Sequence, residues 1–142
     1  MVKRRSPKAK TIREVETRQP NLTTKPKIVF SFEHFLDHDD VGQSLATWVD
    51  NNPKLLQGLF EKLQHLSSKN TATLSQDDVF TLYGDFPSNN NTDFKCPPNF
   101  NDKSWGVIRN IGGQKARVAG FLENNVFYLV FLDAEHKFWK SK

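Results

Sequence analysis

Three apolar runs separated by short turn signals occupy the last third of the chain, and they restrict its possible folds more than any other feature. The runs cover residues 104–110, 115–122 and 126–132. Gly112-Gly113 and Asn124-Asn125 lie between them, and such pairs suit two-residue hairpin turns because those turns need positive φ at both central positions. The sequence therefore predicts an antiparallel meander that ends in a charged stretch, residues 133–139.

Upstream of the meander, the hydrophobic spacing predicts one strand followed by helices. Apolar residues alternate with others from residue 27, which favours a strand; they are Ile28, Phe30 and Phe32. From Val41 the spacing fits a short amphipathic helix that ends at Asn51-Asn52. Pro53 suits the first turn of a longer helix, with Asn52 as its cap. The apolar stripe of this longer helix is Leu55, Leu56, Leu59, Phe60, Leu63 and Leu66.

A third helix is predicted where Ser75 and Asp78 have the spacing of a capping box. Its apolar residues are Val79, Phe80, Leu82 and Tyr83. Residues 84–103 then predict a long loop, either a binding loop or covering flap, or a surface excursion pinned by Phe86, Phe94 and Phe100. We expect an α+β fold in which an N-terminal strand and two to three helices pack on a C-terminal antiparallel sheet of three to four strands.

The turn at Asn124-Asn125 sets a register that places Phe121 opposite Tyr128, Ala119 opposite Val130 and Arg117 opposite Leu132. The face expected to pack on the helices carries Trp105, Val107, Val118, Gly120, Leu122, Phe127, Leu129 and Phe131. The other face carries Ile108, Lys115, Arg117, Ala119, Phe121, Tyr128, Val130 and Leu132. Because this second face mixes cations with apolar groups, we expect a groove, an interface or a surface covered by the long loop. A register slip of one residue would interchange the faces.

The net charge of +4 is distributed unevenly along the chain. Residues 1–27 hold nine Lys or Arg and two acids, whereas residues 28–142 hold eleven Lys or Arg and fourteen acids. With few large apolar groups, residues 1–26 are expected to form a flexible basic arm, and residues 27–142 a single domain. Such an arm attracts polyanions through counterion release, which makes Lys3, Arg4 and Arg5 candidate RNA contacts. A solubilising tail is the alternative.

Several classes of protein are disfavoured by the sequence. No apolar run is long enough to span a membrane, and the N-terminus lacks the apolar stretch of a secretory signal, so we expect a cytoplasmic protein with no membrane partner. The lone Cys96 excludes an intrachain disulfide and a cysteine zinc cluster, and we interpret it as an inert thiol rather than a nucleophile.

One polar segment has the spacing of a metal site. His34 and His38 are four residues apart, beside Asp37, Asp39 and Asp40, which would suit a divalent metal on a helix. The alternative is a polar turn whose acids cap the following helix at its positive end. We favour the turn and expect no metal and no cofactor.

The meander carries the pattern W-x-x-I … A-R-V-x-G … N-V-F-Y-L-V-F-L-D-x-x-H-K-F, behind a strand and two helices. This combination resembles the RelE/ParE-type toxins, within the barnase, EndoU, colicin and RelE ribonuclease group, over about residues 27–139. Many members of that family cut messenger RNA, commonly on the ribosome, and others poison gyrase. The resemblance implies a toxin-like endoribonuclease of a toxin–antitoxin or phage-defence module, with a cognate antitoxin as partner.

By this resemblance, Arg117 corresponds to a phosphate-contacting arginine, and a terminal strand over residues 133–137 supplies the last catalytic or RNA-contacting side chain. Metal-independent RNA cleavage must deprotonate the 2′-hydroxyl, stabilise the phosphate and protonate the leaving 5′-oxygen. His136 is the general acid/base candidate because its ordinary pKa lies near neutrality. Arg117 suits a phosphate clamp, and Lys115 or Lys137 add positive charge.

The remaining RNA-binding candidates are Arg109, Tyr128 and Trp139, of which the two aromatic residues suit base stacking. Each assignment has a plainer alternative. His136 can be a solvated residue, Arg117 can pair with Asp133, and Tyr128 can belong to the core or to an interface. The alternative function is a non-catalytic module that binds RNA or protein through the same basic face.

Overall fold

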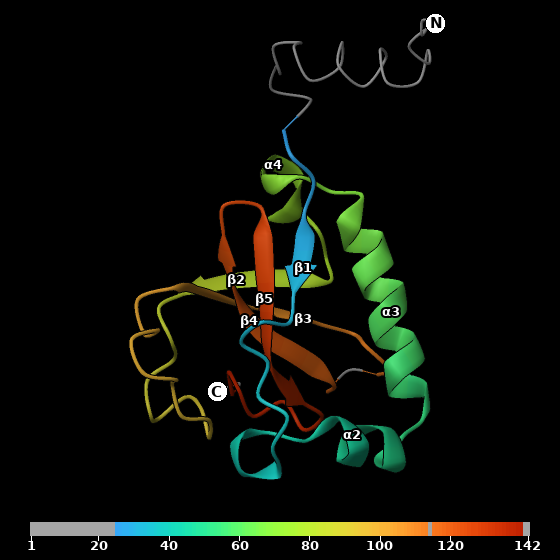
Figure 1. Cartoon of the computed structure of the whole chain (residues 1–142), viewed down its shortest axis with the longest axis vertical. Coiled ribbons are helices and arrows are strands. Elements are labelled where there is room, and N and C mark those ends of the chain that lie inside the picture. Colours follow the sequence, from blue (N-terminus) through green and yellow to red (C-terminus); the bar gives the residue numbers. More distant parts are fainter. Residues whose placement is uncertain (1–24, 114, 141–142) are drawn as a thin grey trace, which may run out of the picture.

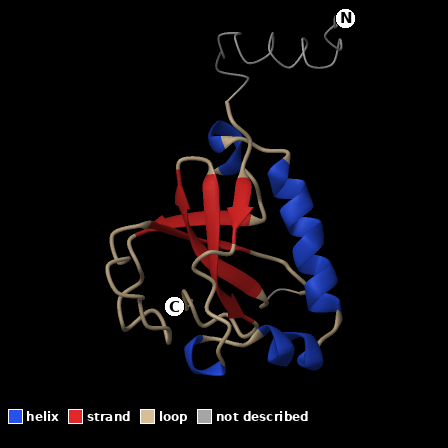
Figure 2. Ribbon diagram, in the orientation of Figure 1, coloured by secondary structure: helices blue, strands red, loops and turns tan. Residues whose placement is uncertain are grey.

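The computed structural model describes residues 25–113 and 115–140 and shows a five-stranded sheet with helices on one side (Figures 1 and 2). The strand order is β1-β5-β4-β3-β2. The strands are β1 (Val29–Ser31), β2 (Phe80–Gly84), β3 (Ser104–Ile108), β4 (Arg117–Glu123) and β5 (Val126–Asp133). β1 is parallel to β5, and the other neighbours are antiparallel. The predicted α+β class is confirmed, whereas Lys3, Arg4, Arg5 and most of the predicted arm lie outside the described residues.

The helical elements are η2 (Asp39–Val41), α2 (Leu45–Asn51), α3 (Lys54–Ser67) and α4 (Thr71–Leu74). At the start of α2, the carboxylate of Asp37 accepts a hydrogen bond from the backbone N–H of Leu45, and that of Asp39 accepts one from Ser44. The interpretation of this acidic segment as a helix cap is therefore confirmed. α3 begins one residue later than predicted, and Asn52 still contributes, because its side-chain oxygen accepts from the N–H of Lys54.

Four leucines of α3 face the sheet and are buried: Leu55, Leu59, Leu63 and Leu66. The prediction that Phe60 belongs to this stripe is wrong, since Phe60 is 62% exposed. One residue advances a helix by 100°, so Phe60 lies too far around the helix from Leu59 to reach the sheet.

The predicted third helix is wrong, because Phe80, Leu82 and Tyr83 belong to strand β2. The nearby helix, α4, ends at Leu74 and takes its capping box from Asn70 and Thr73 instead of from Ser75 and Asp78. The apolar and aromatic residues at this position fit a strand as well as one short helical turn, and pairing with β3 decides the outcome.

Each face of the sheet has its own apolar cluster. The cluster on the helix side includes Trp48, the four α3 leucines, Ile108, Val118, Phe127, Leu129 and Leu132. The cluster on the opposite side, called here the loop-side cluster, contains Phe94, Trp105, Val107, Ala119, Phe121, Val130, Phe131 and Phe138. Phe86 and Phe100 of the long loop pack against it, as do Tyr83, Tyr128 and Trp139. The second face is therefore covered by the loop and the C-terminal stretch, which was one of the predicted outcomes.

The predicted pairing of β4 with β5 is correct only near the hairpin. Phe121 lies opposite Tyr128, as expected, but a bulge between Ala119 and Gly120 shifts the register beyond it. Ala119 faces Phe131 and Arg117 faces Asp133, where Val130 and Leu132 were predicted. Phe131 consequently joins the loop-side cluster, and Leu132 turns to the helix side.

The predicted two-residue turn at Gly112-Gly113 is also wrong. Such a turn would place Val107 opposite Val118, but the structure pairs Ile108 with Val118. The longer connection shifts β3 by one residue, and one residue exchanges the faces of a strand. Trp105 and Val107 therefore lie in the loop-side cluster and Ile108 on the helix side, each opposite to the prediction.

Candidate functional site

Arg117, His136 and Trp139, three of the predicted site residues, lie together with Asp133 and Tyr83 at one end of the sheet; we call these five residues the Arg117 cluster. Arg117 opens β4 directly opposite Asp133, the last residue of β5. Its side chain is half-buried. Burial lowers the pKa of Arg117, and the nearby Arg109 also lowers it. Tyr83 and Asp133 act in the opposite direction and raise the pKa of Arg117. A guanidinium stays cationic at neutral pH despite such shifts.

Asp133 shapes the backbone of this site. It is 1% exposed, and its carboxylate accepts hydrogen bonds of 2.9 Å from the backbone N–H groups of Lys137 and Phe138. Burial raises the pKa of this carboxyl, and the two backbone donors oppose that rise. The stretch after Asp133 is therefore a turn closed by a buried carboxylate, and the predicted terminal strand over residues 133–137 is wrong.

The turn holds His136 beside Arg117. His136 has φ of 61°, in the left-handed region, and its imidazole is half-buried. Burial lowers the pKa of His136, the nearby Arg117 lowers it further, and Asp133 opposes both. The neutral imidazole, which accepts a proton, is therefore favoured at neutral pH.

Trp139 stacks flat on Tyr83 at the side of this site. The two rings are 4.2 Å apart between centroids and 4° from parallel. Tyr83 comes from β2 and Trp139 from the end of the described chain, so this stack joins the edge strand to the C-terminal turn. Both residues are half-buried, which leaves part of the aromatic surface accessible.

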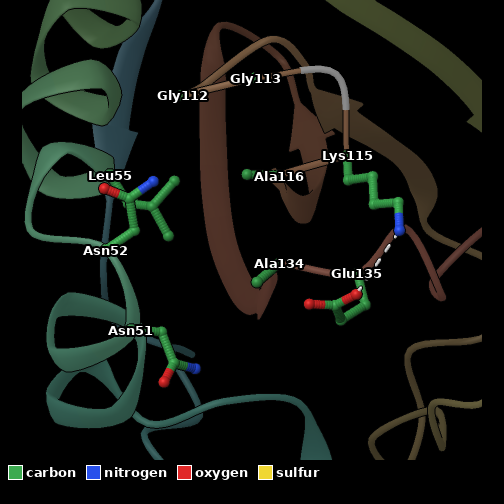
Figure 3. A pocket seen from close by; sticks show the side chains of 9 residues that line it. All are labelled: Asn51, Asn52, Leu55, Gly112, Gly113, Lys115, Ala116, Ala134 and Glu135. Carbon is green, nitrogen blue, oxygen red and sulfur yellow. Dashed lines mark ion pairs between the residues drawn. The ribbon is translucent and has the colours of Figure 1, made fainter.

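The other predicted basic residues have separate surroundings. Arg109 is in electrostatic reach of Arg117, but one of its terminal nitrogens donates to the backbone oxygen of Asp78. The side chain of Lys115 is 72% exposed and lies 3.9 Å from a carboxylate oxygen of Glu135, at a hollow that faces α2 and α3 (Figure 3). Lys137 is exposed, and its backbone oxygen accepts from the N–H of Asp93 in the long loop.

Tyr128 lies toward the other end of the sheet. It pairs with Phe121, four residues along β4 from Arg117, which corresponds to about 13 Å. Its ring stacks on Phe121 at 4.9 Å and lies 5.3 Å from that of His34. Tyr128 is thus part of the loop-side cluster and not of the Arg117 cluster.

Tyr83 was not predicted as a site residue, because the sequence around it was interpreted as a helix. The signal that would have placed it was the two-residue alternation of Phe80 and Leu82 with Thr81 and Tyr83, in a segment rich in aromatic and β-branched residues. Asp133 was foreseen only as an ion-pair partner of Arg117. Its second role, as acceptor for the turn, depends on where β5 ends.

The described residues contain no group of three or more His, Cys, Asp and Glu side chains that could hold a metal ion. The ring of His34 packs among those of Phe100, Phe121 and Tyr128. Burial raises the pKa of the Cys96 thiol, which disfavours the reactive thiolate. Within residues 25–113 and 115–140, no helix is long and apolar enough to cross a membrane.

No family model, no curated protein and no solved structure matches this chain. Its function is therefore proposed from the geometry of the Arg117 cluster.

Proposed function

We propose that this protein is a toxin-like, metal-independent endoribonuclease that cleaves RNA at the Arg117 cluster. The observation that carries the proposal is the position of a half-buried cationic guanidinium next to an imidazole whose pKa is lowered. A phosphate-binding cation and a neutral base are the two groups that attack by a 2′-hydroxyl requires. The Tyr83–Trp139 stack adds an aromatic surface for an unpaired base, an interaction worth about 1–3 kcal/mol.

In the proposed reaction, the ribose 2′-oxygen attacks the adjacent phosphorus, and the bond from phosphorus to the 5′-oxygen of the next nucleotide breaks. The products are a 2′,3′-cyclic phosphate and a free 5′-hydroxyl. Neutral His136 accepts the proton of the 2′-hydroxyl, and Arg117 stabilises the charge on the phosphate oxygens. The Tyr83 hydroxyl, which lies in electrostatic reach of Arg117, protonates the leaving oxygen and regains its proton from His136 through water.

The biological setting rests on the resemblance to RelE/ParE-type toxins. In that setting the protein acts in the cytoplasm on messenger RNA, at the ribosome, and a cognate antitoxin covers the Arg117 cluster until it is removed. The proposed base-stacking surface, Tyr83 and Trp139, suits a single RNA strand, whose bases are unpaired.

Cleavage by the purified full chain tests the proposal. Single-stranded RNA, with and without ribosomes, is incubated in the presence of a chelator, and the new ends are mapped. Arg117→Ala and His136→Ala are expected to lower the cleavage rate by about 10²-fold or more, since each removes a charge-stabilising or proton-transfer group. Lys54→Ala, on the exposed side of α3, serves as the control and is expected to cleave normally. Unchanged cleavage in both site variants would contradict the assignment.

A non-catalytic RNA-binding module is the second candidate, and one observation favours it. His136 is the only described side chain of the Arg117 cluster whose ordinary pKa lies near neutrality, so the site has one conventional acid/base group where cleavage uses two. Tight RNA binding without cutting, even with ribosomes added, would establish this alternative. Growth arrest and new transcript ends on induction in cells would support the nuclease.

A further inference from the structure

A second basic site lies where the chain enters the described fold, far from the Arg117 cluster. A hollow of about 620 Å³ is bordered by Lys25, Pro26, Lys27, Ser68, Lys69, Asn70 and Thr73. Three of these residues are lysines, three carry hydroxyl or amide groups, and none is acidic. We call it the Lys69 hollow. Its size is within the usual range for ligand pockets, about 300–1,000 Å³.

Hydrogen bonds fix the backbone around this hollow. The N–H of Ile28 donates to the oxygen of Lys69 at 2.9 Å, and Lys27 forms a β-bridge with Asn70. On the other side, the carboxamide of Asn125 donates to the oxygen of Lys27 at 2.8 Å. The backbone at Lys27 and Ile28 is thus held between the α3–α4 turn and the β4–β5 hairpin, so this border of the hollow is fixed before any ligand binds.

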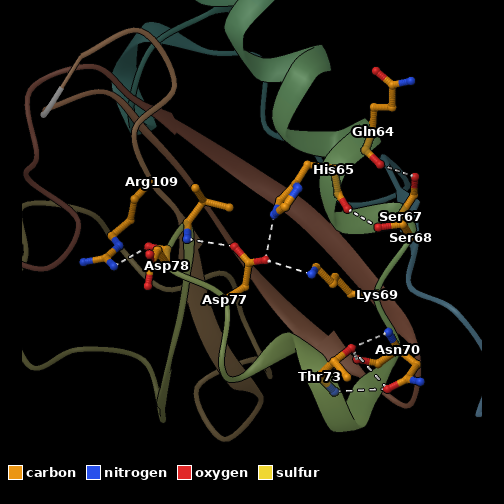
Figure 4. Close-up of polar contacts among 11 residues, drawn as sticks. Gln64, His65, Ser67, Ser68, Lys69, Asn70, Thr73, Asp77, Asp78 and Arg109 are labelled. Carbon is orange, nitrogen blue, oxygen red and sulfur yellow. Dashed lines mark hydrogen bonds and ion pairs between the residues drawn. The ribbon is translucent and has the colours of Figure 1, made fainter. Parts of the chain in front are cut away.

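The polar side chains of the hollow retain donors for an anion. Asn70 uses its side-chain oxygen to accept from the N–H groups of Ala72 and Thr73; Figure 4 draws the contact with Thr73. Among the described residues, this leaves its two amide N–H donors for another acceptor. Lys69 Nζ lies 3.6 Å from Asp77 Oδ2. Asp77 carries one negative charge against three lysines, so it offsets only part of the positive charge of the hollow.

We propose that the Lys69 hollow binds a backbone phosphate of RNA and anchors the strand away from the Arg117 cluster. This inference rests on the proposed function, because it concerns the same RNA. β1, which follows the hollow, pairs with the start of β5 at Val126, and the Arg117 cluster lies at the end of β5, at Asp133. The seven residue steps of extended strand between these ends separate the two sites by about 23 Å. Residues 1–24 add seven Lys or Arg and two acids on the N-terminal side of Lys25.

An RNA phosphate fits the hollow better than a membrane surface does. Membrane association combines cations with exposed apolar side chains, and Pro26 is the only apolar residue among those that border the hollow. Lysine ammonium groups, an amide and hydroxyls in a concave site are donors suited to a phosphodiester oxygen.

Binding of a fluorescent 2′-O-methyl RNA to the full chain tests this inference, because that RNA cannot be cleaved through its 2′-oxygen. Lys25→Ala/Lys27→Ala/Lys69→Ala is expected to weaken binding about tenfold and to reduce the salt slope by about 0.7 for each phosphate that is no longer neutralised. Lys25→Ala/Lys27→Ala leaves Asp77 paired and is expected to show most of the effect, should the triple variant fold poorly. Lys54→Ala/Lys62→Ala/Lys95→Ala removes the same number of charges and is the control. Its salt slope of RNA binding is expected to stay closer to that of wild type than the slope of the Lys25/Lys27/Lys69 variant does.

The outcomes separate this inference from the proposed function. If wild-type protein cleaves no RNA but the lysine variants still show weaker binding and a smaller salt slope, the nuclease proposal fails and the anchor stands. If cleavage occurs and the lysine variants bind RNA like the control, the anchor alone is overturned. Vesicles of phosphatidylcholine and phosphatidylserine test the membrane alternative. If the lysine variants bind RNA like wild type but no longer bind these vesicles, the hollow binds a membrane surface and the RNA anchor is overturned.

Discussion

At the residue scale, two carboxylates are held by backbone N–H groups, and yet their pKa values shift in opposite directions. Asp77 accepts from the N–H of Val79 and contacts His65 and Lys69. Although desolvation is the largest single influence on it and raises its pKa, these partners together lower the pKa of Asp77 below the usual 3.8. Around Asp133, desolvation outweighs the backbone donors and raises the pKa above 3.8.

These opposite shifts predict opposite pH dependences of stability. The contribution of ionised Asp77 is present above pH 3.8 and is lost as the pH falls through its lowered pKa. The contribution of Asp133 is largest below pH 3.8 and is lost as the pH rises through its raised pKa. Each unit by which the pKa differs between the folded and the unfolded state changes the free energy of unfolding by about 1.4 kcal/mol.

Urea unfolding of wild type, Asp77→Asn and Asp133→Asn as a function of pH measures both effects. The stability advantage of wild type over Asp77→Asn is expected to grow as the pH rises from the acid range. The free energy of unfolding of wild type, relative to that of Asp133→Asn, is expected to fall as the pH rises above 3.8. Two difference curves that run in parallel would contradict the opposite signs.

His136 combines a left-handed backbone with the proposed catalytic imidazole, which allows the two roles to be separated. Because φ is 61°, His136→Gly removes backbone strain, and its free energy of unfolding is expected to equal that of wild type or exceed it by up to about 1 kcal/mol. His136→Ala keeps the strain and is expected to be less stable than His136→Gly. Both variants are expected to lose RNA cleavage. Denaturant unfolding and the cleavage assay on the same samples check this, and full cleavage by His136→Gly would remove the imidazole from the mechanism.

At the scale of elements, helix α3 lies unusually close to the connection between β3 and β4. A Cβ atom on Gly58 would lie 2.5 Å from the backbone oxygen of Ile111. Alanine at a helix interior normally stabilises by about 1 kcal/mol relative to glycine. Here we expect the reverse, because the backbone of Ile111 or the helix must move to relieve the overlap.

Gly58→Ala is therefore predicted to lower the free energy of unfolding by about 1–3 kcal/mol. Thermal or urea unfolding measures the change. Gln57→Ala, on the exposed side of the same helix, is the control and is expected to change stability by less than about 0.5 kcal/mol. A more stable Gly58→Ala variant would show that α3 can move away from the β3–β4 connection.

The same elements show how far the sequence predicts this fold. Strong periodicity predicted α3 and the three C-terminal strands, and the Asn124-Asn125 turn predicted the register beside it. Gly120 inside the β4 pattern is compatible with a bulge but does not fix its position, and the longer β3–β4 connection is a backbone feature without a distinct residue signal. Each moves side chains to the other face. For the site, the sequence indicated Arg117, His136 and Trp139. The alternation over residues 80–83 also allowed the strand that carries Tyr83, but it fits a short helix as well, and the pairing of β2 with β3, a tertiary contact, decides between them.

At the scale of the whole molecule, the sheet is enclosed on both faces, and the C-terminal turn contributes Phe138 to the loop-side cluster. Phe138 is fully buried, with ring centroids 5.3 Å from Phe86 and 5.7 Å from Trp105. It follows His136 by two residues, so its packing also holds the turn beside Arg117.

Phe138→Ala is predicted to lower the free energy of unfolding by about 3–5 kcal/mol, the usual cost of removing a buried phenylalanine ring. Phe60→Ala removes the same ring from a position that is 62% exposed and is expected to cost less than about 0.5 kcal/mol. Denaturant unfolding of both variants measures the difference. Equal, small losses of stability would mean that the C-terminal turn is not anchored by the loop-side cluster.

The charge of the whole chain predicts how its N-terminal residues contribute to RNA binding. Residues 1–24 hold seven Lys or Arg against Glu14 and Glu16, whereas residues 28–142 carry more acids than bases. Removal of residues 1–24 is therefore expected to weaken RNA binding and to flatten its salt dependence, by about 0.7 in slope for each phosphate that these residues neutralise. Cleavage of RNA at saturating concentration is expected to persist, because the Arg117 cluster is retained. Titration of the uncleavable RNA at several salt concentrations measures the slope, and Lys3→Gln/Arg4→Gln/Arg5→Gln should reduce part of it. An unchanged slope in both variants would leave these residues with a solubilising role and assign all phosphate binding to the described fold.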